Sequence, residues 1–231
     1  MSTIAENLQA VVDRIGAAAT QAGRRADEVQ LLAVSKTFGP EAVLAAVRAG
    51  QSRFGENYLQ EALDKIVALA GQGIEWHFIG PVQSNKTRPI AENFAWVHSV
   101  ERLKIAQRLS EQRPAALGPL NICLQVNVSG EQTKSGCAPA ELPELARAVA
   151  ALPGVRLRGL MAIPEPAADE EQQRVPFRQL RALYDALRAD GLDLDTLSMG
   201  MSGDMDAAIK EGATIVRVGS AIFGARTYKQ T

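Results

Sequence analysis

The strongest constraint on the fold of this chain is a regular alternation of short apolar runs with amphipathic helical patterns. The runs expected to form strands are 31–34, 53–55, 75–79, 96–97, 122–128, 155–163, 196–199 and 215–218. Helical patterns that stop at glycine or proline lie between them, for example 40–48, 139–152 and 175–189. Strands that alternate with helices pair in parallel through right-handed crossovers. Eight such units predict an α/β fold, a closed (β/α)8 TIM barrel, with an open doubly wound sheet as the alternative.

The residues before the first strand carry a helical pattern of their own. Apolar side chains from Ile4 to Ala19 recur at spacings of three and four, which predicts an amphipathic helix over about 5–22. The 231 residues, of which 46% are hydrophobic, can bury a substantial core. We therefore predict one domain over 1–231, with an extra N-terminal helix in 1–24 and the barrel in 30–226.

Charge and apolar patterning restrict the class of partner. Lysine and arginine number 25 against 26 aspartate and glutamate, so no overall field attracts nucleic acid or an anionic membrane. Charges interrupt every apolar run before the roughly 20 residues that a membrane span needs. The N-terminus lacks the pattern of a secretory signal, and two cysteines are too few for a disulfide framework. We expect a cytoplasmic protein with reduced thiols that binds neither nucleic acid nor membrane.

In a TIM barrel the chemistry lies where the strands end and helices begin. The first predicted strand runs directly into Lys36. A lysine there faces the barrel mouth, where burial and nearby cations lower its pKa and free the amine to attack an aldehyde as a Schiff base. The alternative is a lysine that only ends the strand and extends into water.

The last two predicted strands end in residues suited to bind phosphate. Ser202 follows the seventh strand, and Gly219 and Ser220 follow the eighth. Glycine and serine allow backbone N–H groups to approach an anion, as barrel phosphate sites require; singly, they are also typical of helix caps and turns. Arg217 shares the face of Gly219 by strand alternation and is expected to point into the barrel. There it needs a ring nitrogen or carboxylate as acceptor, or an internal ion pair.

Other polar constellations are weaker signals. Both histidines, His77 and His98, precede Ser202, which is the wrong order for an esterase with a serine elbow. Glu75 and His77 share a strand face without a third metal ligand, so we expect His77 to be a hydrogen-bonded barrel residue and no metal site. The cations at Lys86 and Lys134 are either sites for an anion or partner or, more simply, solvated charge.

Several motifs together resemble one known family along nearly the whole chain. They are Ala33-Val34-Ser35-Lys36-Thr37, Phe54-Gly55-Glu56-Asn57-Tyr58, Trp76-His77-Phe78-Ile79-Gly80 with Gln83-Ser84-Asn85-Lys86, Gly159-Leu160-Met161, Leu197-Ser198-Met199-Gly200-Met201-Ser202 and Arg217-Val218-Gly219-Ser220-Ala221-Ile222-Phe223-Gly224. In this combination and order they are similar to the pyridoxal phosphate homeostasis protein family.

The resemblance implies a fold, a cofactor and a set of site residues. The fold would be the barrel of alanine racemase, and the cofactor would be pyridoxal 5′-phosphate, held as a Schiff base on Lys36. Arg217 would face the pyridine nitrogen, and Asn57 and Met161 would lie beside the ring. The resemblance assigns the phosphate to Ser202, Gly219 and Ser220.

The resemblance also implies binding and carriage of the cofactor inside the cell without catalytic turnover. An arginine opposite the pyridine nitrogen favours its unprotonated form and weakens carbanion chemistry. A related racemase needs a tyrosine from an additional domain, and Tyr58, Tyr184 and Tyr228 do not lie in one. An incoming amine could displace Lys36 and release the cofactor to amino acids or apo-enzymes, and we expect a monomer. A pyridoxal phosphate-dependent racemase and a sugar-phosphate enzyme are the alternatives.

Overall fold

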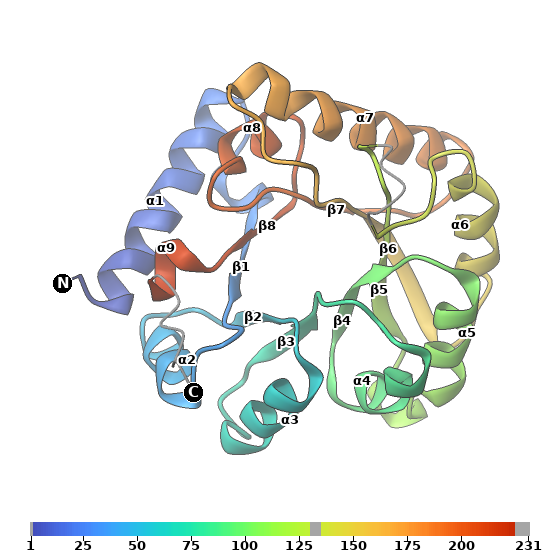
Figure 1. Cartoon of the computed structure of the whole chain (residues 1–231), viewed down its shortest axis with the longest axis horizontal. Coiled ribbons are helices and arrows are strands. Elements are labelled where there is room, and N and C mark those ends of the chain that lie inside the picture. Colours follow the sequence, from blue (N-terminus) through green and yellow to red (C-terminus); the bar gives the residue numbers. More distant parts are fainter. Residues whose placement is uncertain (1, 130–134, 225–231) are drawn as a thin grey trace.

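A computed structural model describes residues 2–129 and 135–224, and its eight strands form one closed parallel barrel. The strands follow one another around the barrel in chain order, and the last pairs with the first (Figure 1). This confirms the predicted TIM barrel and excludes the open sheet. The strands are β1 (Gln30–Val34), β2 (Arg53–Glu56), β3 (Glu75–Phe78), β4 (Trp96–Val100), β5 (Leu120–Gln125), β6 (Val155–Met161), β7 (Thr196–Ser198) and β8 (Ile215–Val218).

The helices surround the barrel and cover the outer face of its sheet (Figure 1). The α-helices are α1 (Ile4–Gln21), α2 (Pro40–Arg48), α3 (Leu59–Ala68), α4 (Thr87–Asn93), α5 (Leu103–Gln112), α6 (Leu142–Ala150), α7 (Glu170–Ala189), α8 (Met205–Lys210) and α9 (Ser220–Phe223). Short 3₁₀ turns are η1 (Ala26–Glu28), η2 (Ser84–Lys86) and η3 (Ala115–Leu117). None of the described helices is long and apolar enough to cross a membrane.

Helix α1 is the predicted additional helix before the barrel. Thr3 caps it in a capping box with Glu6, which satisfies two backbone donors of its first turn. Leu8, Val11 and Ile15 on one face are buried in the main hydrophobic core. Burial of each such side chain contributes about 1.5–3 kcal/mol, which attaches the helix firmly beside α8 and α9.

Strand alternation divides the core into two parts. Most buried apolar side chains lie in one large cluster that includes helix side chains, such as Val43 and Phe177, as well as strand side chains. Leu32, Val34 and Ile79 form a separate small cluster with Ile215 inside the barrel. Because side chains alternate along each strand, polar residues on the inward face are enclosed by the barrel and must find their hydrogen bonds there.

Several element boundaries differ from the sequence prediction, and two of them concern polar residues or proline. The helix predicted to start at 175 begins at Glu170, because the side chain of Asp169 caps its first turn at 2.9 Å from the Gln172 nitrogen. Pro176 therefore lies inside the helix. The fourth strand extends to Val100 and includes polar residues that the prediction excluded.

Candidate functional site

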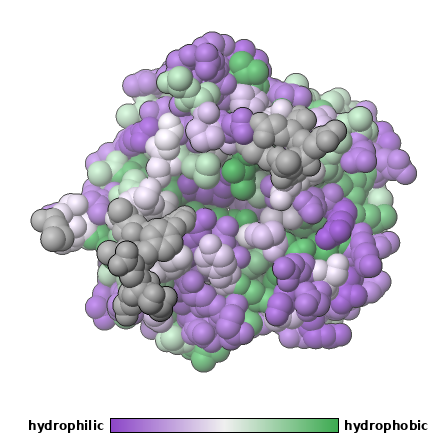
Figure 2. Space-filling view, in the orientation of Figure 1, coloured by the Kyte–Doolittle hydropathy of each residue, from purple (hydrophilic) through white to green (hydrophobic). Residues whose placement is uncertain are grey.

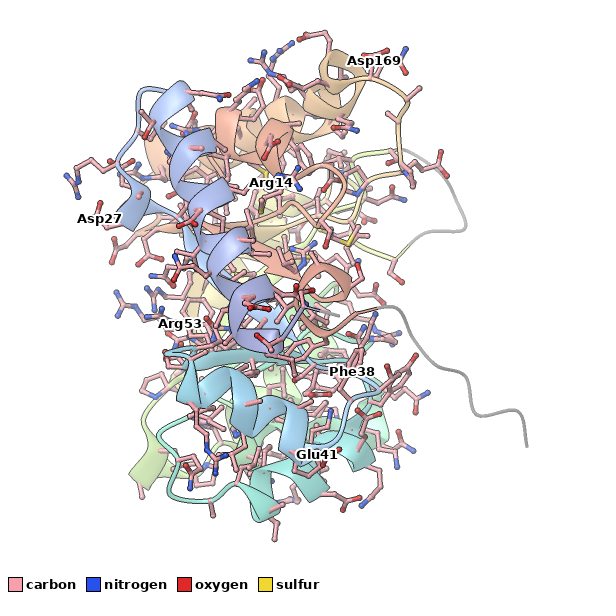
Figure 3. All side chains as sticks on the ribbon, turned by 90° about the vertical axis from the view of Figure 1, so that its left-hand side faces the viewer. Arg14, Asp27, Phe38, Glu41, Arg53 and Asp169 are labelled. Carbon is pink, nitrogen blue, oxygen red and sulfur yellow. The ribbon has the colours of Figure 1, made fainter. Side chains whose placement is uncertain are left out.

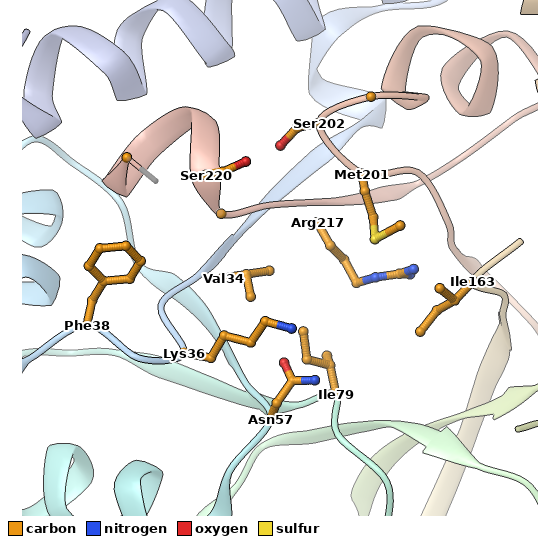
Figure 4. Close-up of a pocket in the computed structure, with 13 residues that line it drawn as sticks. Val34, Lys36, Phe38, Asn57, Ile79, Ile163, Met201, Ser202, Arg217 and Ser220 are labelled. Atoms are coloured by element: carbon orange, nitrogen blue, oxygen red, sulfur yellow. The ribbon is translucent and has the colours of Figure 1, made fainter. Parts of the chain in front are cut away.

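A cavity of about 290 Å³ opens where the strands end at one mouth of the barrel (Figure 4). This volume is at the small end of the range of about 300–1,000 Å³ that is typical of small-molecule sites. Figure 2 looks onto this face, where hydrophilic residues cover the outer surface and hydrophobic residues show toward the middle. The lining residues are Val34, Lys36, Phe38, Asn57, Ile79, Ile163, Met201, Ser202, Gly203, Arg217, Gly219, Ser220 and Gly224.

Six of the seven residues expected at the site line this one cavity. They are Lys36, Asn57, Ser202, Arg217, Gly219 and Ser220. The closed pairing of β1 with β8 brings the first and last thirds of the chain together, as the register Leu32 to Arg217 shows. The lysine and the glycine-rich ends therefore lie within reach of one small molecule.

Met161 does not line the cavity, and its expected place beside a bound ring stays a prediction. Its side chain is fully buried and packs with Trp96 and Cys123. Ile163 follows two positions later, nearer the mouth, and lines the cavity instead. The sequence motif identified the correct strand end, but only the structure shows how far along it the cavity lies.

A buried ion pair fixes the end of β1 just before Lys36. The Lys65 ammonium lies 2.7 Å from Glu56 Oε1 and donates to the Ser35 carbonyl at 2.8 Å. The Ser35 hydroxyl donates to the same Glu56 oxygen at 2.6 Å. Burial raises the pKa of Glu56, and the Lys65 charge opposes that rise. These contacts hold the backbone from which the cavity lysine extends.

The residue after the cavity lysine is held in an unusual conformation. Thr37 has a φ of 70°, the left-handed region that β-branched residues rarely adopt. Its backbone nitrogen donates to Glu61 Oε1 at 2.7 Å, and Glu61 also contacts the Lys65 ammonium at 2.6 Å. Such strain persists only where the surroundings enforce it. Lys36 is thus fixed on both sides, by the ion pair before it and by Glu61 after it.

Asn57 brings an acceptor that has no hydrogen-bond partner among the described residues. Its Oδ1 atom is buried, and Asn57 lines the cavity close to Lys36 (Figure 4). Gly80 on the next strand end allows this position, because a Cβ atom there would lie 2.2 Å from the Asn57 carbonyl oxygen. A buried acceptor without a donor is costly, which indicates that a ligand or solvent molecule completes it.

Helix α1 fastens the two glycine-rich strand ends. Figure 3 shows this helix facing the viewer with Arg14 on it. The Arg14 guanidinium donates to the Ser202 carbonyl at 3.1 Å and forms an ion pair with Asp206 at 3.1 Å. The Asn7 amide donates to the Ile222 carbonyl in α9 at 3.0 Å. The N-terminal helix thus sets the spacing of the cradle that the sequence predicted for phosphate.

Arg217 forms the floor of the cavity, 4% exposed, as strand alternation predicted. Its Nη1 donates to the Ser198 carbonyl at 2.7 Å and hydroxyl at 2.8 Å, and its Nη2 donates to the Ala162 carbonyl at 2.9 Å. These acceptors are neutral oxygens, and no carboxylate of the described residues lies within ion-pair distance of the guanidinium, which excludes the alternative of an internal ion pair among those residues. Burial lowers the pKa of Arg217 to about 10, so the guanidinium stays charged at neutral pH.

The remaining polar candidates lie away from the cavity. His77 is hydrogen-bonded inside the barrel, to Glu75 at 2.9 Å and to His98 at 2.8 Å, which confirms its predicted role. Among the described residues, no group of three or more histidine, cysteine, aspartate or glutamate side chains is arranged to hold a metal ion. Lys86 is exposed on η2, and Lys134 lies outside the described residues.

The comparisons with known proteins agree with this geometry. The chain matches the alanine racemase N-terminal domain family over residues 6–227. It is 65% identical to the pyridoxal phosphate homeostasis protein of Pseudomonas aeruginosa over 228 residues, which cover 99% of this chain and 98% of that protein. It is 54% identical to the protein of that name from Escherichia coli over the full length of both. The structure of PipY from Synechococcus elongatus with PLP bound is 36% identical, with a TM-score of 0.85 over 96% of this chain and all of that one.

The fold and the cavity thus define an eight-stranded barrel of the alanine racemase N-terminal type. Identity this high over whole chains narrows the class further. The chain belongs to the pyridoxal phosphate homeostasis protein family.

Proposed function

We propose that this chain binds pyridoxal 5′-phosphate in the cavity and takes part in intracellular homeostasis and carriage of that cofactor. The observation that carries this proposal is the single cavity that Lys36 and the glycine-rich ends of β7 and β8 share. The names of its relatives and the PLP bound to PipY support it.

The chemistry of the lining residues fits the cofactor. Pyridoxal phosphate supplies an aldehyde, a ring nitrogen and a phosphate dianion. The cavity offers an amine, a charged guanidinium and a pair of hydroxyls next to glycine backbone, together with apolar walls at Val34 and Ile79. The buried Asn57 Oδ1 remains available for a donor on the ligand. Each part of the cofactor therefore has a group suited to bind it.

Each residue then has one proposed task. The neutral Lys36 amine would attack the aldehyde carbon and hold it as a Schiff base, with the aldehyde oxygen leaving as water. Ser202, Gly219 and Ser220 bind the phosphate through hydroxyl and backbone donors. Arg217 donates to the ring nitrogen, and because a guanidinium does not release its proton, that nitrogen remains an acceptor. The ring is then a weak electron sink, which favours carriage over racemase chemistry.

Release of the cofactor needs only a competing amine. We propose that an amino acid, or the lysine of an apo-enzyme, replaces Lys36 on the aldehyde carbon, so that one C–N bond forms as the other breaks. The cavity mouth lies at the surface, with Ser220 and Met201 exposed, which gives such an amine access. In this proposal the protein acts as a cytoplasmic monomer with one domain.

Reduction with borohydride after incubation with pyridoxal phosphate tests the assignment. Peptide mass mapping is expected to place the pyridoxyl label on Lys36, and the label is expected to fall to background in Lys36→Ala. Lys86→Ala, an exposed lysine outside the cavity, serves as the matched control and should keep full labelling. The Lys36→Ala chain should remain folded by circular dichroism, since this half-buried side chain is not core filling.

Four results would overturn parts of this proposal. A label on another lysine, or full labelling of Lys36→Ala, would show that Lys36 is not the lysine that forms the Schiff base. No visible absorbance change with pyridoxal phosphate would favour a sugar-phosphate enzyme. Exchange of amino-acid α-protons in deuterated water, above the rate with free cofactor, would favour a racemase.

A further inference from the structure

A continuous row of hydrogen bonds crosses the inside of the barrel from the floor of the cavity. The Ser198 hydroxyl, which accepts from Arg217, lies 2.7 Å from His98 Nδ1. His98 Nε2 lies 2.8 Å from His77 Nδ1, and His77 Nε2 lies 2.9 Å from Glu75 Oε1. We call these four residues, Ser198, His98, His77 and Glu75, the barrel relay.

The relay ends at the opposite mouth of the barrel. The Glu75 carboxylate is 41% exposed and accepts from Arg53 Nε at 3.2 Å. Seen from the side, Arg53 and the cavity residue Phe38 lie toward opposite ends of the barrel (Figure 3). Between these ends Ser198, His98 and His77 are almost completely buried.

With both rings neutral, the Glu75 carboxylate fixes the direction of the protons, because it can only accept and His77 Nε2 must therefore donate to it. At the other end arginine has donors and no acceptor, so the Ser198 oxygen accepts from Arg217 and its single proton can point to His98 Nδ1. His98 then carries its proton on Nε2 and donates to His77 Nδ1. His77 in turn carries its proton on Nε2 and donates to the Glu75 carboxylate. The reverse arrangement would place a bare ring nitrogen against a carboxylate, acceptor against acceptor.

The surroundings favour neutral rings in this arrangement. Burial lowers the pKa of His77 below its ordinary value and that of His98 well below it. The groups facing His77 are Glu75 and Arg53, and those facing His98 are His77 and Arg217. The His77 ring also stacks on the Trp96 ring at 5.4 Å, which fixes its plane.

We propose that the barrel relay positions Arg217 through hydrogen bonds of fixed polarity and couples the floor of the cavity to the far mouth of the barrel. The guanidinium has five N–H donors, and the Ser198 and Ala162 oxygens take three of them. The relay thereby leaves Nε and one Nη2 proton for the cavity. The coupling to a bound ring nitrogen rests on the proposed function, whereas the polarity of the relay does not.

Nitrogen NMR of the ligand-free protein labelled at histidine tests the polarity. The chain has two histidines, both in the relay, so the spectrum contains four ring nitrogens. The expected result is a proton on Nε2 and a bare Nδ1 in both rings at pH 7. A proton on Nδ1 of either ring would overturn the proposal.

Two variants test the coupling without ligand. Glu75→Gln should shift the resonances of His98, which Glu75 does not touch, and Ser198→Ala should shift those of His77. Matched controls are Glu92→Gln, a surface carboxylate, and Ser110→Ala, a buried serine bonded to a backbone N–H. If either relay variant affects only its immediate neighbour, the coupling is refuted. If Ser198→Ala does not fold, the effect of Glu75→Gln on the His98 resonances is by itself the test of the coupling.

Titration with pyridoxal phosphate then tests the link to the cavity. Binding should move the resonances of both histidines although neither lines the cavity, and Glu75→Gln should weaken binding about fivefold, the low end of typical site-to-site coupling. Unchanged histidine signals on a demonstrably loaded protein would refute the link. If the protein binds no pyridoxal phosphate at all, the proposed function is refuted. The spectra of the ligand-free protein still test the polarity and coupling of the barrel relay in that case.

Discussion

Replacement of Lys65 by methionine should be among the most damaging single changes near the cavity. Methionine keeps most of the length of the side chain and removes the ammonium. The Glu56 carboxylate, fully buried, would keep only the Ser35 hydroxyl as a partner, because its Oε2 atom has none among the described residues. Glu61, one-third exposed, would keep the Thr37 N–H and solvent as partners.

The expected loss follows from the burial of this pair. Removal of one partner from a buried ion pair costs about 3–5 kcal/mol, because the other charge remains buried without compensation. For a chain of this size each kcal/mol corresponds to about 2–4 °C, so the melting temperature should fall by about 6–20 °C. Glu56 has a raised pKa and can become neutral by taking up a proton. The loss of stability caused by Lys65→Met should therefore be smaller at pH 5 than at pH 8.

Urea denaturation followed by circular dichroism measures these differences. The double variant Glu56→Gln with Lys65→Met should recover much of the loss, since it leaves no charge in the interior. Lys210→Met, which breaks a partly exposed pair with Glu170, is the matched control and should cost less than about 1 kcal/mol. If Lys65→Met costs no more than this control, the pair does not hold the end of β1 as argued.

The remaining predictions concern acid and two glycines. Because the folded-state pKa values of His77 and His98 lie below 6.5, the unfolded state binds more protons below that pH, and stability should fall as pH falls through 6.5. Each histidine contributes up to about 1.4 kcal/mol per pH unit; the raised pKa of Glu56 acts in the opposite sense. Urea midpoints between pH 7.5 and 5 measure the slope, and a flat profile would contradict the neutral buried rings. Gly159→Ala should destabilise by at least about 2 kcal/mol, because its Cβ would lie 1.7 Å from a carbonyl oxygen of β7. Gly16→Ala, within α1, would place its Cβ in ordinary contact with Ala26 Cβ at 3.9 Å and should instead stabilise by about 0.5–1 kcal/mol; equal melting temperatures for the two variants would refute the packing argument.

The sequence predicted the barrel because apolar runs and helical patterns report burial directly. The sequence-based prediction was least accurate at the strand ends. The run 122–128 is apolar except at Gln125 and Asn127, yet β5 ends at Gln125, because pairing stops where the neighbouring strand ends while Val126 stays buried in the following loop. The predicted fourth strand ended before the polar residues His98 and Ser99, which belong to β4. Their hydrogen-bond partners are supplied only by the closed barrel and cannot be read from the local sequence.

The site was predictable to the extent that it depends on single strand ends. Lys36 and the glycine-rich ends stand out because barrel geometry demands polar residues there. The Glu56–Lys65 pair and the barrel relay were not predicted, although Glu75 and His77 had been placed on one face. Both depend on which side chains from different strands and helices meet, which is set by register and not by local pattern.

The pairing of β1 with β8 has a consequence for the order of events during folding. Lys36 follows the first strand of the ring and Gly219 follows the last, so a chain interrupted before Gly219 has the lysine without the other half of the cavity lining. A ligand that needs both can recognise only the finished ring, and by mass action it stabilises that state alone. Occupancy of the cavity would therefore report that synthesis and closure of the polypeptide are complete.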